Sequence, residues 1–152
     1  MSIEQYGSEM NESAIADFLE AQGLGTLSMG NEAGGYGIPM SFGFDRSQNR
    51  CLLQISEGEG NLKTEFLEEG GRVSLSTFEW ESIDEWRSVI VRGTIHQISD
   101  EEIPKAAGIF AAQAKIASLD VFHHPIEDMD LVWYEIQIEE KHGRQASTGS
   151  SS

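Results

Sequence analysis

The stretch YGIPMSFGFD, residues 36–45, decides the expected fold. Large and small side chains alternate along it, and successive side chains of a β-strand point to opposite faces. One face carries Tyr36, Ile38, Met40, Phe42 and Phe44, and the other carries Gly37, Pro39, Ser41 and Gly43. The pattern predicts a strand with one face in a core. Because proline has no N–H for a ladder hydrogen bond, Pro39 indicates an edge position or a bulge.

The face of small residues allows two interpretations. A strand without side-chain bulk lets a flat ligand approach its backbone, and it equally lets another sheet or a helix pack closely against it. The residues alone leave both interpretations open.

The rest of the chain supplies further strands and helices around this one. Alternating or apolar runs predict strands at 24–29, 50–56, 72–78, 86–98 and 131–140, and helical patterns lie at 11–22, 60–69 and 99–119. A turn at RSQN, 46–49, predicts that 50–56 is the hairpin partner of 36–45. The strands 72–78 and 86–98 are joined by an acidic connection, EWESIDE, 79–85. The last helix is expected to open with the capping-box pattern SDEE, 99–102. Short turns favour antiparallel pairing, and strands avoid exposed edges by closing into a barrel. We therefore predict a mainly β (α+β) fold, a six-stranded antiparallel barrel with flanking helices.

The length of 152 residues predicts one domain. We assign residues 1–10 to an N-terminal segment, 11–140 to the domain and 141–152 to a disordered tail. No apolar run approaches the roughly 20 residues that span a bilayer. The start MSIEQYGSEMNES is acidic and polar, unlike a secretory signal, so we expect a cytoplasmic protein.

The charge of the chain is strongly negative, with 26 acidic and 10 basic side chains and a net charge of −16. Surfaces that bind nucleic acids or anionic membranes are basic, so the charge argues against both partners. The acidity is spread over the whole chain, and spread acidity with few lysines resembles proteins adapted to high salt, where counterions screen self-repulsion. The alternative interpretation is simple solubility.

Cysteine and histidine give little support to nucleophilic or metal chemistry. Cys51 is the single cysteine and lies in the apolar run CLLQI, which indicates a small buried hydrophobic residue. HHPIEDMD, 123–130, could gather a metal ion, but a solvated loop is the simpler interpretation, and we predict no metal site. The motifs GxSxG and HExxH are absent, so any catalysis would depend on a cofactor.

The segment EGEGNLKTEF, 57–66, contains Lys63, the only lysine in the first 104 residues. It lacks the glycine that precedes lysine in a phosphate-binding loop of the Walker type, because Leu62 stands there. Glycines followed by the first turn of a helix still bring backbone N–H groups, the Thr64 hydroxyl and the Lys63 ammonium together as an anion site. Alternatively, Lys63 is a surface lysine paired with Glu59 or Glu65.

The segment WRSVIVRGTIH, 86–96, is the longest predicted strand. Trp86, Ser88 and Arg92 share one face of it, and Arg87 lies on the other. An indole, a hydroxyl and a guanidinium could therefore line one groove. The alternative is an ordinary barrel strand with outward polar residues.

Five stretches in order, GLGTLSM, YGIPMSFGFD, GNLKTEFLE, GRVSLSTFE and WRSVIVRGTI, resemble the pyridoxamine 5′-phosphate oxidase-related, FMN-binding split-barrel family, and more narrowly its acidic haloarchaeal members. The resemblance covers about residues 11–138. It implies a six-stranded Greek-key split barrel and a homodimer with FMN in a groove at the dimer interface.

The resemblance also implies which residues hold the cofactor. Pro39, Met40, Ser41 and Phe42 would border the isoalloxazine ring, with hydrogen bonds from their backbone. Lys63 and Thr64 would hold the phosphate with Asn61 nearby, and Trp86, Arg87, Ser88 and Val89 would form the adjoining strand. Catalytic residues stay unassigned.

The implied function is that of a flavin-dependent oxidoreductase acting on an unknown small acceptor, with an equally unknown electron donor. A deazaflavin-dependent reductase and a non-catalytic flavin carrier or sensor are the alternatives. True pyridoxamine phosphate oxidases use several basic residues, including an arginine-to-lysine strand motif, and this chain lacks that set. The resemblance therefore does not imply oxidation of vitamin B6.

The Lys63→Ala variant should bind FMN more weakly by roughly 1–3 kcal/mol, the scale of a hydrogen bond to a charged group. The loss is expected because a phosphate dianion is repelled by a chain of charge −16 unless local cations hold it. Titration of the flavin-free protein with FMN measures it, and equal affinity in the variant would remove Lys63 from the site.

Overall fold

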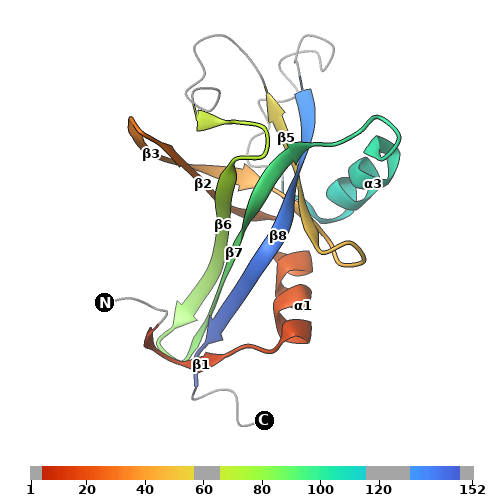
Figure 1. Ribbon diagram of the computed structural model, residues 1–152. Helices are drawn as coiled ribbons and strands as arrows, with labels where there is room; N and C mark the ends of the chain where they lie inside the picture. The colour runs from red at the N-terminus through yellow and green to blue at the C-terminus, as the bar shows by residue number, and fades with distance from the viewer. Residues whose placement is uncertain (1–4, 57–65, 116–130, 148–152) are drawn as a thin grey trace, which may run out of the picture.

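The computed structural model describes residues 5–56, 66–115 and 131–147. Its strands form an eight-stranded antiparallel sheet in the order β3-β2-β6-β7-β8-β5-β4, with β1 paired to β8 (Figure 1). The strands are β1 (Ser8–Glu9), β2 (Leu24–Asn31), β3 (Gly34–Ser41), β4 (Gly43–Asp45), β5 (Arg50–Ser56), β6 (Arg72–Ser82), β7 (Glu85–Gln97) and β8 (Leu131–Gln145), and the helices are α1 (Glu12–Gln22) and α3 (Ile103–Gln113). The predicted mainly β, antiparallel fold is confirmed, with two strands more than expected.

The decisive stretch 36–45 forms two strands rather than one. β3 and β4 stand at opposite ends of the strand order, yet Phe42 alone separates them in the chain. One residue spans less than about 4 Å, so the sheet has to curl until its two ends meet. Side chains from β3, β5 and β7, such as Met40, Leu53 and Val91, accordingly share one core.

The predicted alternation along 36–45 is confirmed. Met40, Phe42 and Phe44 are buried, and Tyr36 and Ile38 pack against the same core. The predicted hairpin with 50–56 involves only β4, because β3 pairs with β2 instead.

The first helix agrees with its prediction. The Asn11 side chain accepts a hydrogen bond from the Ala14 N–H at 2.8 Å and caps α1, whose Phe18 and Leu19 are buried. Gly23 ends the helix in the left-handed conformation at φ 67°, which glycine adopts at little cost. The helix packs along the lower half of β7 and β8 (Figure 1).

Three boundary predictions are wrong. Residues 79–82 and 85 of the acidic connection belong to β6 and β7, which meet at a turn over Ile83 and Asp84. α3 starts at Ile103 instead of following Ser99 directly, and the capping residue Glu102 makes no side-chain capping bond. β8 continues to Gln145, so residues 141–145, assigned to the disordered tail, belong to the sheet. The predicted helix 60–69 lies mostly outside the described residues.

A buried ion-pair cluster joins β4, β5 and β8. The side chain of Arg50 is 3% exposed, and its guanidinium contacts Asp45 at 3.0 Å and Glu135 at 2.5 Å. Burial alone would raise the pKa of the Asp45 carboxyl, but hydrogen bonds from Ser47 and Arg50 lower it below its usual value. Asp45 therefore stays ionised opposite Arg50.

No helix in the described part of the chain is long and apolar enough to cross a membrane.

The Arg50→Met variant should lose about 3–5 kcal/mol of unfolding free energy, because two carboxylates would be left in the interior without their cation. Arg46→Met is the matched control: Arg46 pairs with Asp17 and Glu20 on the surface, and such pairs contribute about 0–1 kcal/mol. Denaturant unfolding measures both variants. Equal losses would show that the buried cluster contributes no more than a surface pair.

Candidate functional site

The candidate site lies on the outward side of the sheet formed by β3, β2, β6 and β7. The side chains there are small or absent over a continuous area, which we name the bare face: Gly37, Pro39, Thr26, Ser28, Ser74 and Ser76. Strand register joins them across the sheet, because Pro39 pairs with Thr26 and Thr26 pairs with Ser76. A flat molecule could therefore lie close to the backbone.

Exposed apolar side chains border the bare face. Phe78 is 66% and Trp80 is 60% exposed, and Leu24 is 38% exposed. Trp86 stands opposite Trp80 across β6 and β7. Exposed apolar patches are typical of interaction surfaces and of ligand-binding grooves.

Four predicted site residues share this side of the sheet. Pro39 and Ser41 lie on β3, and Trp86 and Ser88 lie on β7, in the alternating positions that face away from the core. Because β2 and β6 lie between them, the two pairs are about 14 Å apart, three strand spacings. β3 also ends the strand order, so the edge position predicted from Pro39 is confirmed. The Ser41 hydroxyl donates to the Lys115 carbonyl.

Three other predicted site residues point inward. Met40 is 8% exposed, and Phe42 and Val89 are fully buried in the core. Only their backbone is available to a ligand, and the Phe42 N–H already donates to the Gly23 carbonyl at 3.1 Å.

Arg87 lies on the opposite side of β7 from Ser88. Its guanidinium pairs with Glu79 at 2.5 Å and lies 4.8 Å from the centre of the Phe18 ring. It therefore ties the β6–β7 hairpin to α1. The predicted placement of Arg87 and Arg92 on opposite faces of the strand is confirmed.

Asn61, Lys63 and Thr64 lie outside the described residues. Phe66, where the description resumes, stacks on Tyr36 of β3 with ring centres 5.4 Å apart.

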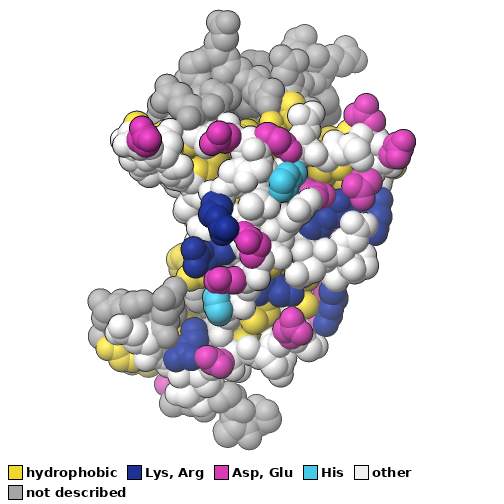
Figure 2. Space-filling view, viewed as in Figure 1, with side chains coloured by type: hydrophobic (Ala, Val, Ile, Leu, Met, Phe, Trp, Pro, Cys, Tyr) yellow, Lys and Arg dark blue, Asp and Glu magenta, His cyan; other side chains and the backbone are white. Residues whose placement is uncertain are grey.

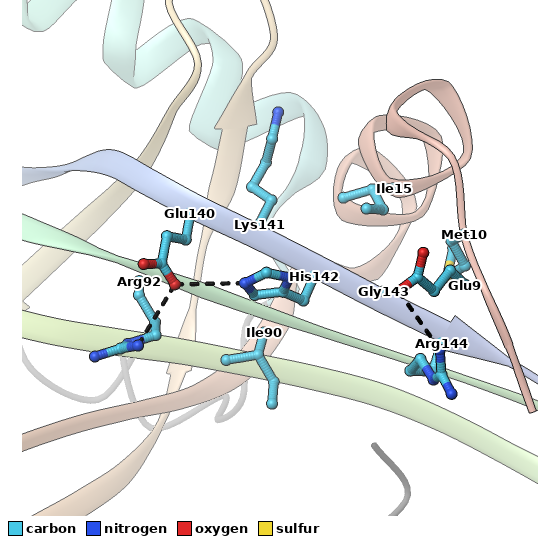
Figure 3. Close-up of a pocket in the computed structure, with 10 residues that line it drawn as sticks. All are labelled: Glu9, Met10, Ile15, Ile90, Arg92, Glu140, Lys141, His142, Gly143 and Arg144. Atoms are coloured by element: carbon cyan, nitrogen blue, oxygen red, sulfur yellow. Dashed lines mark hydrogen bonds and ion pairs between the residues drawn. The ribbon is translucent and has the colours of Figure 1, made fainter. Parts of the chain in front are cut away.

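A cavity of about 490 Å³ lies next to the bare face, along β8. Arg92, His142 and Arg144 line it from β7 and β8, and Figure 3 shows them in a row with Glu140 between the first two. In Figure 2, Lys and Arg side chains gather on this side of the molecule, in the hollow between the β2–β3 hairpin and the tip of β6–β7. The sequence analysis missed His142 and Arg144 because it ended the last strand at residue 140. KHGRQ, 141–145, has no apolar side chain, so alternation gave no signal for the strand there.

The structure gives no support to a cysteine nucleophile, and the segment 123–130, considered as a metal site, lies outside the described residues. Cys51 is fully buried, and burial raises the pKa of its thiol to about 12, which agrees with its interpretation as a buried hydrophobic residue. Among the described residues, no three His, Cys, Asp or Glu side chains are grouped so that they could hold a metal ion.

Comparison with known protein families identifies the family of this chain. The pattern of the pyridoxamine 5′-phosphate oxidase family matches residues 11–145. The chain belongs to this family. No protein of curated function matches it in sequence.

Solved structures with low sequence identity share the fold. An FAD-binding protein from Mesorhizobium loti superposes with a TM-score of 0.69 at 19% identity, covering 92% of this chain and 98% of that one. An FAD-binding protein from Mycobacterium smegmatis superposes with a TM-score of 0.67 at 16% identity, covering 91% of this chain and 98% of that one. A conserved hypothetical protein from Mycobacterium tuberculosis superposes with a TM-score of 0.71 at 18% identity, covering 94% of this chain and 90% of that one.

Gly37→Ala and Gly43→Ala should affect stability in opposite directions. A Cβ on Gly37 would meet Ser28 and Thr26 at an ordinary 3.6 Å, so the variant should keep its stability or gain up to about 1 kcal/mol. A Cβ on Gly43 would lie 3.1 Å from the Phe110 Cα of α3, so that variant should lose about 1–3 kcal/mol. Thermal and denaturant unfolding test the pair, and a loss at Gly37 as large as at Gly43 would contradict an open bare face.

Proposed function

We propose that the protein is an FMN-binding flavoprotein that transfers hydride or electrons to a small acceptor. The observation that carries the proposal is the bare face, which Trp86 and Ser88 border. The chain that forms this face belongs to the pyridoxamine 5′-phosphate oxidase family. Two structural neighbours of the same fold are FAD-binding proteins, which supports a flavin as the class of cofactor.

The bare face fits a tricyclic ring for a steric reason. The backbone at Gly37 is not crowded, since an added Cβ would make only ordinary van der Waals contacts with Ser28 and Thr26, both at 3.6 Å. β3 pairs with β2 along one edge and ends the strand order, so its other edge can offer N–H and C=O groups to the polar rim of a flavin. The Ser88 hydroxyl on β7 is a further hydrogen-bonding group on the same side of the sheet.

Lys63 and Thr64 are proposed to hold the phosphate of the cofactor. Lys63 precedes Phe66 by three residues, so the two Cα atoms are at most about 11 Å apart. Asn61 belongs to the same segment.

A second copy of the chain is the proposed cover of the site. Phe78 and Trp80 expose large apolar surfaces beside the bare face, and a two-fold dimer would bury the same residues of both copies. The cofactor would then lie between the two subunits, shielded from water.

The protein residues position the cofactor rather than react. When bound, the flavin supplies the redox chemistry. The bare face itself carries four hydroxyl groups, one glycine and one proline, and among its described residues there is no carboxylate, histidine or thiol that could act as a general acid or base. Its residues can bind and orient the ring and exclude water.

Protein purified at high salt should be yellow and should release FMN on heating, as mass spectrometry would show. Release of FAD or a deazaflavin instead would support the proposed site but would show that the cofactor is not FMN. Colourless protein that binds none of the three cofactors would contradict the proposal. Stopped-flow reoxidation with candidate acceptors separates an oxidoreductase from a carrier or sensor, which would show no turnover.

Gly37→Leu should weaken FMN binding about tenfold or more, because a branched side chain would occupy the bare face. Gly108→Leu is the matched control, since Gly108 lies on exposed α3 with open space around it. Fluorescence titration of flavin-free protein measures both. Unchanged affinity in Gly37→Leu would mean that the ring lies elsewhere.

A further inference from the structure

The β6–β7 hairpin ends in an acidic tip. Residues 79–87 hold one arginine, Arg87, and four carboxylates: Glu79, Glu81, Asp84 and Glu85. Four negative charges against one positive charge give this segment a net charge of −3. The turn at the tip also presents an apolar side chain, because Ile83 is 80% exposed. The tip therefore combines exposed apolar surface with an excess of negative charge.

A pocket on the outward side of the same strands carries exposed guanidinium groups. We name it the arginine pocket: its volume is about 240 Å³, and the residues that line it include Arg72, Arg92, Ser28 and Ser74. The side chains of Arg72 and Arg92 are 77% and 60% exposed, and each pairs with one glutamate, at 3.1 Å and 3.4 Å. The two arginines and their two partners balance in charge, whereas the tip is strongly negative. In Figure 2, Lys and Arg side chains gather in the hollow between the β2–β3 hairpin and the tip.

The tip and the arginine pocket lie at equal distances from Phe78 along the hairpin. Phe78 is paired with Ser88 across β6 and β7, and Ser74 is paired with Arg92. Asp84 precedes Ser88 by four residues, and Arg92 follows Ser88 by four. Four residues of a strand span about 13 Å. A two-fold axis that passes beside Phe78 at right angles to the strands therefore brings the tip of each copy over the arginine pocket of the other.

The same axis covers the exposed apolar residues and the bare face. Phe78, which is 66% exposed, would meet Phe78 of the second copy at the axis. Trp80 and Ser76 are each two residues from Phe78 and lie on the outward side of β6. Trp80 of one copy would therefore stand over Ser76 in the bare face of the other. Sheets that pack face to face are about 10 Å apart, so the second copy would supply an aromatic wall to the site.

A two-fold axis parallel to the strands is the alternative arrangement, and charge disfavours it. It would place one tip beside the other, and two segments of net charge −3 repel each other. The perpendicular axis instead brings Asp84 of one copy to the exposed guanidinium of Arg92 in the other. Complementary charges fix the register of an interface even where they add little affinity.

We propose that two copies of the chain pair through the outward sides of β6 and β7, with the acidic tip of each copy seated in the arginine pocket of the other. Trp80 of each copy then covers the bare face of its neighbour. This inference rests on the proposed function for the second copy as the cover of the site, and it adds the orientation of that copy and the contacts that fix it.

An exchange of charge between tip and pocket tests this orientation. Asp84→Arg and Arg92→Glu each place like charges together in the dimer, so each should weaken dimerisation at least about tenfold. The double variant Asp84→Arg/Arg92→Glu keeps the net charge of the chain and forms the pair in reverse. Its dimer dissociation constant should return to within about threefold of the wild-type value. Sedimentation equilibrium of the purified full chain at constant ionic strength measures all three variants.

Two control variants make the same changes of charge elsewhere. Asp100→Arg reverses an exposed carboxylate ahead of α3, and Arg46→Glu reverses an exposed guanidinium beside α1. Each control should dimerise within about threefold of the wild type, because neither position lies at the tip or the pocket. Circular dichroism of every variant checks that the chain is folded.

Three results would overturn the proposed orientation: a monomeric wild type, single variants that dimerise as well as the controls, or losses in the single variants without recovery in the double variant. The measurement needs no flavin, so its outcome is separate from that of the proposed function. Colourless protein that shows the recovery would contradict the flavin and support this dimer. Yellow protein without the recovery would contradict the orientation alone.

Discussion

The closure of the sheet at Phe42 is the constraint on which the rest of the structure depends. The residue joins strands at opposite ends of the strand order, its side chain is fully buried, and its N–H is bound by the carbonyl of Gly23 at the end of α1. Once the two ends meet, every large side chain of 36–45 faces one interior. Every small residue of the same stretch is then left on the outside.

The outside of the closed sheet is used in two ways, and this resolves the two interpretations of the small residues. At Gly43 the backbone of α3 comes close, and the helix covers the strand. At Gly37 and Pro39, six and four residues earlier, no described element covers the strand, and both residues are exposed. Close helix packing is therefore correct for one end of the stretch, and an open surface is correct for the other.

Secondary structure could be predicted from the sequence where burial and local backbone geometry favour the same conformation. Alternation along 36–45 and the cap at Asn11 each follow from local rules that the tertiary structure does not oppose. The errors lie where the strands leave the core. Around Trp80 and Ile83 both faces of the hairpin meet solvent, so acidic residues mix with apolar ones and hide the strand pattern. Beyond residue 140, β8 is held by pairing to β7 and β1 rather than by a continuous apolar face, so Lys141 to Gln145 resembled a polar tail.

Part of the candidate site could be predicted from the sequence, because alternation places Trp86 and Ser88 on the same face of their strand. The pairing of Ser88 with Arg144 could not be predicted, because it depends on the register between β7 and β8, which no local sequence pattern specifies.

The few cations of the chain are used at specific places rather than spread as counter-charges. Arg50 neutralises two buried carboxylates, and Arg87 fastens the long hairpin to α1, so both serve the fold. Arg92 and Arg144 make longer contacts nearer the surface: Arg92 pairs with Glu140 at 3.4 Å, and Arg144 donates to the Tyr6 carbonyl at 3.2 Å. In a protein of net charge −16, each added cation lowers the repulsion felt by an approaching anion, and this effect is largest where low-dielectric walls concentrate the field.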